Sequence, residues 1–133
     1  MPEHVHLLVY PRHPKHSVAK LLHSLNTSVS VKAVNFWKEF DPAFLTNVQD
    51  HQPNGKAAYR FWQRGGGFDL NLWTPAKIWE HIDYIHANPV RRGLCVNPED
   101  WRWSSAADFL GTRAGPLPLC HQHLPPDARR LRH

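Results

Sequence analysis

Two histidines near the start of the chain are the first residues whose type and spacing could do chemistry. His4 and His6 lie in the stretch 4–9, where the order of apolar and other residues has the period of a β-strand. Side chains two positions apart on a strand share a face, so both imidazoles could bind one divalent metal ion. Chance is the competing explanation, because 11 His in 133 residues give roughly one such pair from composition alone. A second pair, His121 and His123, is interpreted as chance.

A helix is predicted in the second half of the chain. Thr74 is a good N-cap and Pro75 suits the first helical position, so the helix should run from 75 to about 87. Asn88 precedes Pro89, which restricts the backbone of Asn88 away from helical angles. The two residues are therefore expected to end the helix.

Four polar residues on this helix follow one another at spacings of four, three and four, so Lys77, His81, Tyr84 and Asn88 share one face. Tyrosine can act as a covalent nucleophile. A tyrosine one turn before an amide, in a chain with a two-histidine strand, is a specific combination. The plainer alternative is a tyrosine at the edge of the core, beside a solvated polar face.

The charge balance indicates a polyanionic partner. The chain has a net charge of +5, with 16 Lys and Arg against 11 Asp and Glu. Arginine suits phosphate because its planar group donates two parallel hydrogen bonds. The 6 Trp, 3 Tyr and 6 Phe could stack on bases. A basic protein with an aromatic core is the alternative.

Length and composition exclude several classes of protein. A chain of 133 residues allows one domain and little more. No apolar run approaches the roughly 20 residues of a membrane helix, and the opening residues do not resemble a secretory signal. Cys95 and Cys120 form neither a metal-ligand spacing nor a disulfide framework, so a cytoplasmic location is expected.

The remaining segments complete the predicted order of elements. We expect a helix from the Ser17 cap to about Glu39, a polar loop over 41–58, a short strand over 60–63 and an extended stretch over 68–73. Residues 112–133 are rich in Pro, Arg and His and should form an irregular tail. Residues 1–111 are therefore the expected domain.

Three strings in this sequence closely resemble REP-associated tyrosine transposases, which belong to the insertion-sequence-200-like superfamily of single-tyrosine HUH transposases. The strings are MPEHVHLLV, RFWQRGGGFDLNLW and HIDYIHANPVRRGLCVNPEDWRWSSA. The resemblance covers residues 1 to about 110. It implies an α+β fold, ferredoxin-like, with an antiparallel sheet and helices packed on one face. It also implies a bacterial protein associated with the nucleoid.

The resemblance implies a role for each residue of the predicted site. His4, His6 and Asn88 would hold Mg²⁺ or Mn²⁺, and Tyr84 would attack a phosphodiester of single-stranded DNA, leaving a 5′-phosphotyrosine and a free 3′-OH. A metal would screen the phosphate charge that opposes attack by a phenol. His81 is expected, with less support, to orient the phosphate or the tyrosine.

DNA contacts are expected just after the predicted helix. The candidates are Arg91, Arg92, Arg102, Trp101 and Trp103, which would hold single-stranded or hairpin DNA of repetitive palindromic elements. The alternative for the two tryptophans is a place in the core. No membrane partner is expected, and a homodimer is left open.

The family pattern also has a strand, a helix and another strand ahead of the two-histidine strand. This sequence lacks them, so it is expected to hold the C-terminal two-thirds of the fold. Two alternatives to an active transposase stay open at this point. One is a relative that binds DNA hairpins without cutting them, and the other is an inactive gene fragment.

Overall fold

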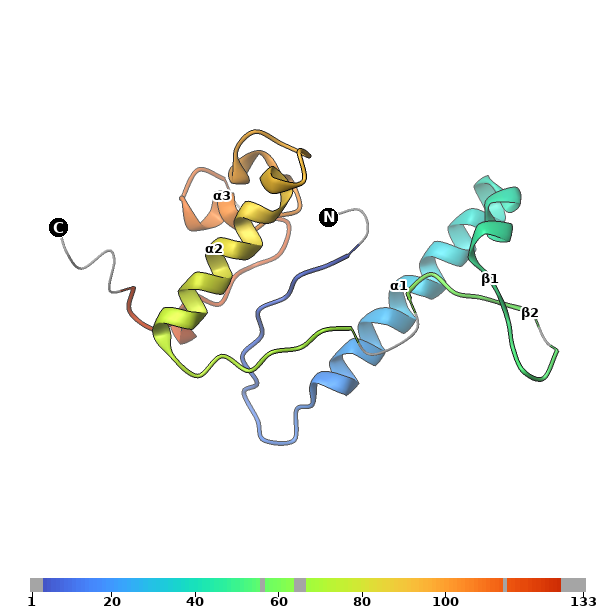
Figure 1. Cartoon of the computed structure of the whole chain (residues 1–133), viewed down its shortest axis with the longest axis horizontal. Coiled ribbons are helices and arrows are strands. Elements are labelled where there is room, and N and C mark those ends of the chain that lie inside the picture. The colour runs from blue at the N-terminus through green and yellow to red at the C-terminus, as the bar shows by residue number, and fades with distance from the viewer. Residues whose placement is uncertain (1–3, 56, 64–66, 114, 128–133) are drawn as a thin grey trace. The chain divides into compact units, whose positions relative to one another are not determined.

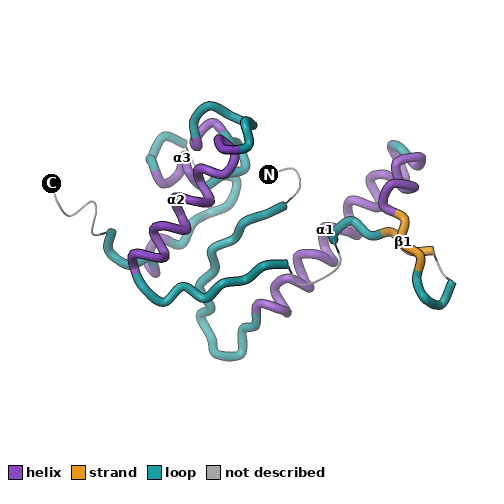
Figure 2. Tube along the Cα trace, viewed as in Figure 1, coloured by secondary structure: helices purple, strands orange, loops and turns teal. Residues whose placement is uncertain are grey.

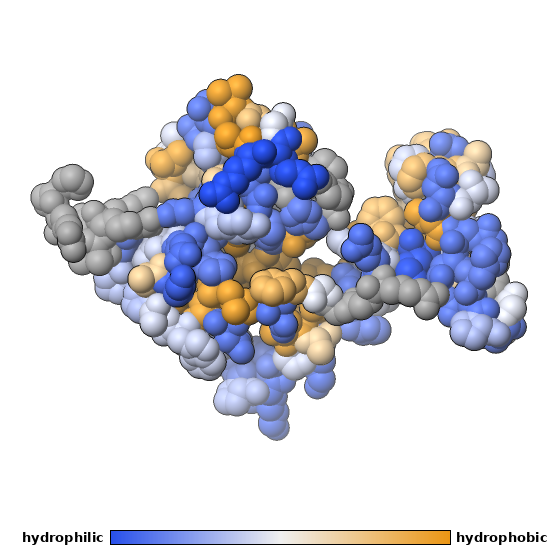
Figure 3. Space-filling view, in the orientation of Figure 1, coloured by the Kyte–Doolittle hydropathy of each residue, from blue (hydrophilic) through white to orange (hydrophobic). Residues whose placement is uncertain are grey.

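The computed structural model of the chain describes residues 4–55, 57–63, 67–113 and 115–127. The chain divides into two compact units (Figure 1). One unit combines Met1–Tyr10 with Leu70–His133, and the other is Pro11–Asp69. Hydrophobic residues are visible on the surface of both units (Figure 3). No helix in the described ranges is long and apolar enough to cross a membrane.

The unit Pro11–Asp69 is built on the long helix α1, Val18–Phe40. Its start confirms the predicted cap, because the backbone N–H of Lys20 donates to Ser17 Oγ at 3.1 Å. The predicted end at about Glu39 is also confirmed, with Asp41 as the C-cap. None of the helix residues is buried, so α1 gains little from packing.

The predicted loop over 41–58 is wrong. This stretch contains the 3₁₀ helix η1, Pro42–Val48, and the strand β1, Gln49–His51, and the strand β2, Ala57–Tyr59, begins within it. The turn of η1 starts where the Asp41 carboxylate accepts from the backbone N–H of Phe44 at 3.3 Å. The polar composition suggested a loop because η1 buries a single residue, Leu45.

The described sheet consists of one antiparallel hairpin (Figure 2). β1 pairs with β2 in the register Gln49↔Tyr59, and Gly55 in the connecting turn has a positive φ of 77°. The strand predicted over 60–63 is therefore wrong, because the observed strand, β2, lies just before it and its pairing with the three-residue β1 stops at Tyr59. The stretch 68–73 contains no strand or helix, as its extended prediction allows.

The strand predicted at the start of the chain is also wrong within the described residues. The segment 4–10 is assigned to no strand, because no other described segment pairs with its backbone, and alternation alone cannot make a strand. Its apolar side chains are exposed, with Val5 at 59% and Leu7 at 48%. The described elements are compatible with the α+β class, and the larger ferredoxin-like sheet stays a prediction.

The unit that carries the candidate site is built around α2, Pro75–Arg91. Its start confirms the predicted Thr74 cap, because the Lys77 backbone N–H donates to Thr74 Oγ1 at 3.3 Å. The predicted end near Ala87 is wrong, since the helix continues through Pro89 to Arg91, about one turn further. A proline this close to the end of a helix removes one hydrogen bond only.

The true end of α2 is a glycine cap. The backbone N–H of Leu94 donates to Pro89 O at 2.9 Å and that of Gly93 donates to Val90 O at 2.9 Å. Gly93 has a φ of 67°. This pair of bonds defines the Schellman motif, in which glycine supplies the left-handed residue. Gly93, rather than Pro89, therefore ends the helix.

The short helices η2 (Pro98–Asp100), α3 (Ala106–Phe109) and η3 (His121–His123) complete this unit. Its buried apolar residues, within the described ranges, are Ile82 and Pro89 of α2 and Ala106 and Ala107 of α3. His86 connects the two helices, because its Nε2 lies 2.9 Å from Ser105 Oγ. The packing of α2 on the segment after it fixes the site-bearing helix in place.

The described part of the tail has one short turn, η3, in otherwise irregular chain. It contacts α2 directly, since the indole N–H of Trp79 donates to Pro125 O at 3.1 Å. His121 Nε2 lies 2.9 Å from Asp108 Oδ1. The tail is therefore irregular in backbone but belongs to the same unit as α2. The predicted domain boundary at 111 stays a prediction.

Candidate active site

Three polar side chains from two distant parts of the sequence meet in the unit of α2. His4 Nε2 lies 3.0 Å from His6 Nε2. Asn88 Nδ2 lies 2.9 Å from the same His6 nitrogen. The structure therefore brings together the three residues that the family resemblance implied as ligands. Their role as ligands stays a prediction.

The contacts at His6 Nε2 cannot all be good hydrogen bonds. An imidazole nitrogen carries either one hydrogen or one lone pair, so it cannot form two well-aligned bonds at once. Adjacent ligands of six-coordinate Mg²⁺, at about 2.1 Å from the ion, lie about 3.0 Å apart. The spacings of 3.0 and 2.9 Å between these donor groups match that value. These two spacings are compatible with a shared cation, and metal binding stays a prediction.

Burial lowers the pKa of His6, and the nearby imidazole of His4 lowers it further. A lowered pKa keeps the ring neutral, which is the form that binds metal. Among the described residues no three His, Cys, Asp or Glu side chains cluster at metal-binding distance. The third ligand here would thus be the Asn88 carboxamide. Its nitrogen faces His6, and rotation of the amide group by about 180° would present its oxygen to a cation.

Tyr84 lies beside this cluster on α2. Its ring centroid is 5.6 Å from that of His6, in an edge-to-face arrangement, and 45% of the residue is exposed. The guanidinium carbon of Arg91 lies 5.4 Å from the centroid of the Tyr84 ring. The tyrosine is therefore accessible to solvent and has a cation over its face.

Arg91 was predicted to bind DNA, but its contact with Tyr84 was not foreseen. Tyr84, Asn88 and Arg91 follow at spacings of four and three, so all three share one face of α2. The sequence carried this signal. It was missed because the helix was expected to end at Asn88, which left Arg91 outside it.

His81 contacts its own helix. Its Nδ1 lies 2.9 Å from Lys77 O, and a carbonyl oxygen only accepts, so Nδ1 is the donor of this contact. His81 shares the face of Tyr84 through its spacing of three residues. Its helper role stays a prediction.

Two of the predicted DNA contacts, Trp101 and Trp103, line a cavity next to His6. The cavity has a volume of about 490 Å³, and its lining includes Val5, His6, Pro89, Trp101 and Trp103. Trp101 is partly buried and Trp103 is 67% exposed. Trp103 therefore does not lie in the core, which was the alternative to a DNA contact for the two tryptophans.

Two further arginines lie near these elements in the sequence. Arg92 is the C-cap of α2, and the guanidinium carbon of Arg102 lies 5.2 Å from the centroid of the Trp103 ring. Both are exposed. Together with Arg91, they give this unit exposed cationic groups that could meet phosphates, and their contact with DNA stays a prediction.

A curated protein of Haemophilus influenzae, named as a REP-associated tyrosine transposase, is 28% identical to this chain over 105 residues. The match covers 79% of this chain and 54% of the relative, so the chain spans about half the length of the curated relative that it matches. The similarity indicates a distant family-level relationship, in agreement with the resemblance seen in the sequence. No family model matches the chain. No solved structure matches it.

Proposed function

We propose that this chain is a transposase-like enzyme that cuts and rejoins single-stranded or hairpin DNA through Tyr84. The observation that carries the proposal is the meeting of His4, His6 and Asn88 beside an exposed tyrosine. The distant relative named as a tyrosine transposase supports the same chemistry. The basic charge of the chain, +5, supports a polyanionic substrate.

His4, His6 and Asn88 would hold one Mg²⁺ or Mn²⁺ ion. The ion would neutralise charge on the scissile phosphate when bound. His6 suits this role because burial keeps its imidazole neutral. Two imidazoles and one amide form a modest site, which leaves room for phosphate oxygens and water.

Tyr84 would supply the nucleophilic oxygen. A bond forms between Tyr84 Oη and the phosphorus, and the bond from phosphorus to the 3′ oxygen breaks. The phenolic proton leaves Oη, and the departing 3′ oxygen takes up a proton to become a hydroxyl. One phosphate ester replaces another, so the strand can be rejoined by the reverse steps without an external energy source.

The neighbours of Tyr84 would position the reactants. Arg91, whose guanidinium carbon is 5.4 Å from the ring centroid, can pair with the phosphate. The apolar cavity next to His6 would accept the nucleoside beside the scissile phosphate. Exposed Trp103 would stack on a base.

The decisive experiment asks whether Tyr84 becomes linked to DNA. A labelled hairpin oligonucleotide with single-stranded flanks is incubated with the chain and Mn²⁺, and covalent adducts are separated under denaturing conditions. Tyr84→Phe removes only the hydroxyl and should abolish the adduct while leaving DNA binding intact. The matched controls are Tyr10→Phe and Tyr59→Phe, which should retain it.

The outcomes separate the proposal from its alternatives. An adduct that persists in Tyr84→Phe, or that maps to Tyr10 or Tyr59, contradicts the assignment. DNA binding without any adduct favours a relative that grips DNA hairpins but does not cut them. If the chain neither binds DNA nor forms an adduct, and also lacks a cooperative unfolding transition, the result favours an inactive fragment.

A further inference from the structure

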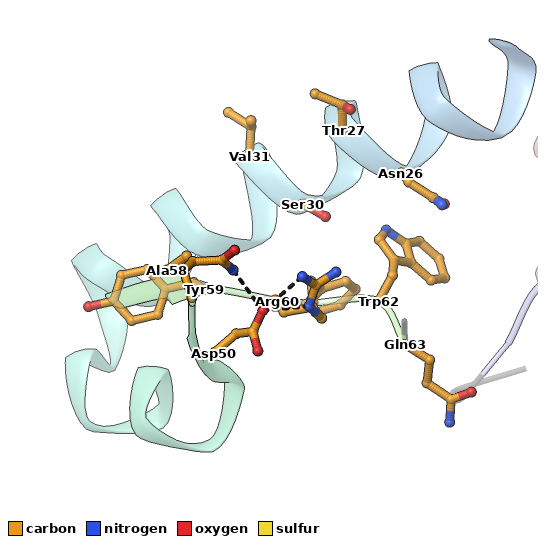
Figure 4. Close-up of a pocket in the computed structure, with 12 residues that line it drawn as sticks. Asn26, Thr27, Ser30, Val31, Asp50, Ala58, Tyr59, Arg60, Trp62 and Gln63 are labelled. Carbon is orange, nitrogen blue, oxygen red and sulfur yellow. Dashed lines mark hydrogen bonds and ion pairs between the residues drawn. The ribbon is translucent and has the colours of Figure 1, made fainter. Parts of the chain in front are cut away.

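The unit Pro11–Asp69 contains a pocket that the proposed active site does not use. Its volume is about 360 Å³, which is at the small end of the range of roughly 300–1,000 Å³ for ligand pockets. It lies between α1 and the segment that continues β2 (Figure 4). A pocket of this size suits a ligand no larger than one nucleoside.

Three aromatic residues close together in the sequence line this pocket, namely Tyr59, Phe61 and Trp62. Tyr59 is 43% exposed and Phe61 is 41% exposed. The rings of Phe61 and Trp62 stand edge to face, with centroids 5.6 Å apart. Their exposed surfaces offer faces on which a planar ring could stack.

The opposite side of the pocket is polar. Asn26 and Ser30 of α1 contribute an amide and a hydroxyl to its lining. In Figure 4 the side chains of Asn26 and Ser30 extend from α1 toward the side on which Trp62 lies. Amide and hydroxyl groups both donate and accept hydrogen bonds, so they suit the edge of a nucleobase.

Trp62 supplies a donor that the fold leaves unsatisfied. Within the described ranges, its Nε1 is the buried side-chain nitrogen that has no hydrogen-bond partner. An unsatisfied buried donor costs about 1–3 kcal/mol. A carbonyl or ring nitrogen of a ligand bound between Trp62 and α1 would offset that cost.

The charges at this pocket indicate a neutral ring rather than a phosphate. Arg60 Nη2 lies 2.8 Å from Asp50 Oδ2 (Figure 4). Gln52 Nε2 donates to the same oxygen at 2.9 Å. Asp50 thus neutralises Arg60, which removes the excess positive charge that an isolated phosphate site needs. A base on a strand keeps its phosphates outside the pocket.

We propose that this pocket binds one unstacked nucleobase of a single DNA strand. Stacking on the aromatic residues would supply affinity, and Asn26, Ser30 and the Trp62 N–H would contact the edge of the base. This inference rests on the proposed function for its source of single-stranded DNA. A free nucleotide carries the same ring and is the other source that the experiment must separate.

The experiment measures how removal of single bases affects binding to the full chain. A labelled single-stranded oligonucleotide is made as a series, each member carrying one abasic position, and affinities are measured by fluorescence anisotropy. Removal of the base at one position should weaken binding to the wild-type chain by about tenfold. Removal of the same base should weaken binding to Trp62→Ala by less than twofold, because that variant no longer holds the base.

Two conservative variants guard against misfolding. Trp62→Phe keeps a ring but removes the N–H, and Asn26→Ala shortens a side chain on an unburied helix; each should weaken binding severalfold with an unchanged melting curve. The matched control is Trp73→Phe, at a residue that is 86% exposed, which should bind like wild type. Equal abasic profiles in wild type and all Trp62 variants would overturn the inference.

Two further readouts separate this inference from the proposed function. Adduct formation at saturating DNA should persist in the Trp62 variants if both are right. An adduct together with unchanged DNA binding in those variants rejects the pocket only, and absence of DNA binding by the wild type rejects both. Competition by a free deoxynucleoside monophosphate at the oligonucleotide's own concentration would overturn the assignment to a strand.

Discussion

Asn88 Nδ2 lies 2.9 Å from His6 Nε2, although 82 positions separate the two residues in the chain. Asn88 is only 7% exposed, so it occupies a defined position rather than a solvated one. The contact connects the start of the chain to the end of α2. It is the relationship on which the proposed metal site depends.

Replacement of the proposed ligands should remove metal binding. The double variant His4→Ala, His6→Ala should show no Mn²⁺ binding by calorimetry, and Asn88→Ala should bind at least about tenfold more weakly, since even outer-shell groups contribute that much. The matched control is the other pair with the same spacing, His121→Ala and His123→Ala. Equal Mn²⁺ binding by both double variants would reject the assignment.

Reversal of charge at the end of α2 should weaken DNA binding without changing sequence preference. Arg91→Glu with Arg92→Glu should lower the affinity for every oligonucleotide by a similar factor, because phosphate contacts carry no sequence information. The dependence of affinity on salt should also become shallower, by about one counterion for each lost phosphate contact. Anisotropy titrations at several salt concentrations measure both effects.

An equal change of charge elsewhere is the control for this prediction. Lys15→Glu with Lys20→Glu alters the net charge by the same amount and lies in the other unit. It should shift affinity less and leave the adduct unchanged. Equal losses in the two double variants would mean that overall charge, rather than the end of α2, holds the DNA.

Gly93→Ala should destabilise the chain through its backbone. The φ of 67° at Gly93 is in the left-handed region, and no atom lies within 4 Å of an added Cβ, so the penalty is conformational only. The free energy of unfolding should fall by about 1 kcal/mol. Chemical denaturation measures it. Gly115→Ala, where φ is not positive and the nearest atom is 3.6 Å away, should be nearly neutral.

His86 should make the chain less stable in mild acid. Burial lowers the pKa of His86, and Asp83 opposes this shift. Between the lowered pKa and the ordinary value of about 6.5, the unfolded chain binds a proton that the folded chain does not. The free energy of unfolding should therefore fall as the pH drops below about 6.5.

The variant His86→Gln isolates this effect. His6 also has a lowered pKa and contributes in the same direction, so the difference between wild type and variant is the quantity to measure. Denaturation at several pH values should give a flatter profile for His86→Gln. Parallel profiles would show that His86 does not carry the pH dependence.

Local signals in the sequence predicted the helix starts well. Ser17 and Thr74 are capping residues whose partners lie three positions away, so both partners of each hydrogen bond are close together in the sequence. The positions of the strands were predicted less well. The segment 4–10 alternates like a strand, but a strand forms only beside a partner strand, which the sequence does not identify. The described residues supply no such partner.

The candidate site shows both sides of this limit. Spacing along α2 correctly put Tyr84 and Asn88 on one face, and the distant pair of His4 and His6 was connected to them through the family resemblance rather than through any local pattern. The contact of Arg91 with Tyr84 was not predicted, because Pro89 was expected to end the helix, whereas Gly93 ends it.

The direction of α2 also has an electrical consequence. The peptide dipoles of a helix sum to about half a negative elementary charge at its C-terminal end, and Asn88 lies in the last turn. This field attracts a cation held by Asn88 and repels a phosphate at the same place. A DNA phosphate bound there would have to overcome that repulsion, and Arg91 and Arg92 would supply the opposing charge. If the helix ran the other way, the same side chains would bind phosphate more readily and a metal ion less well.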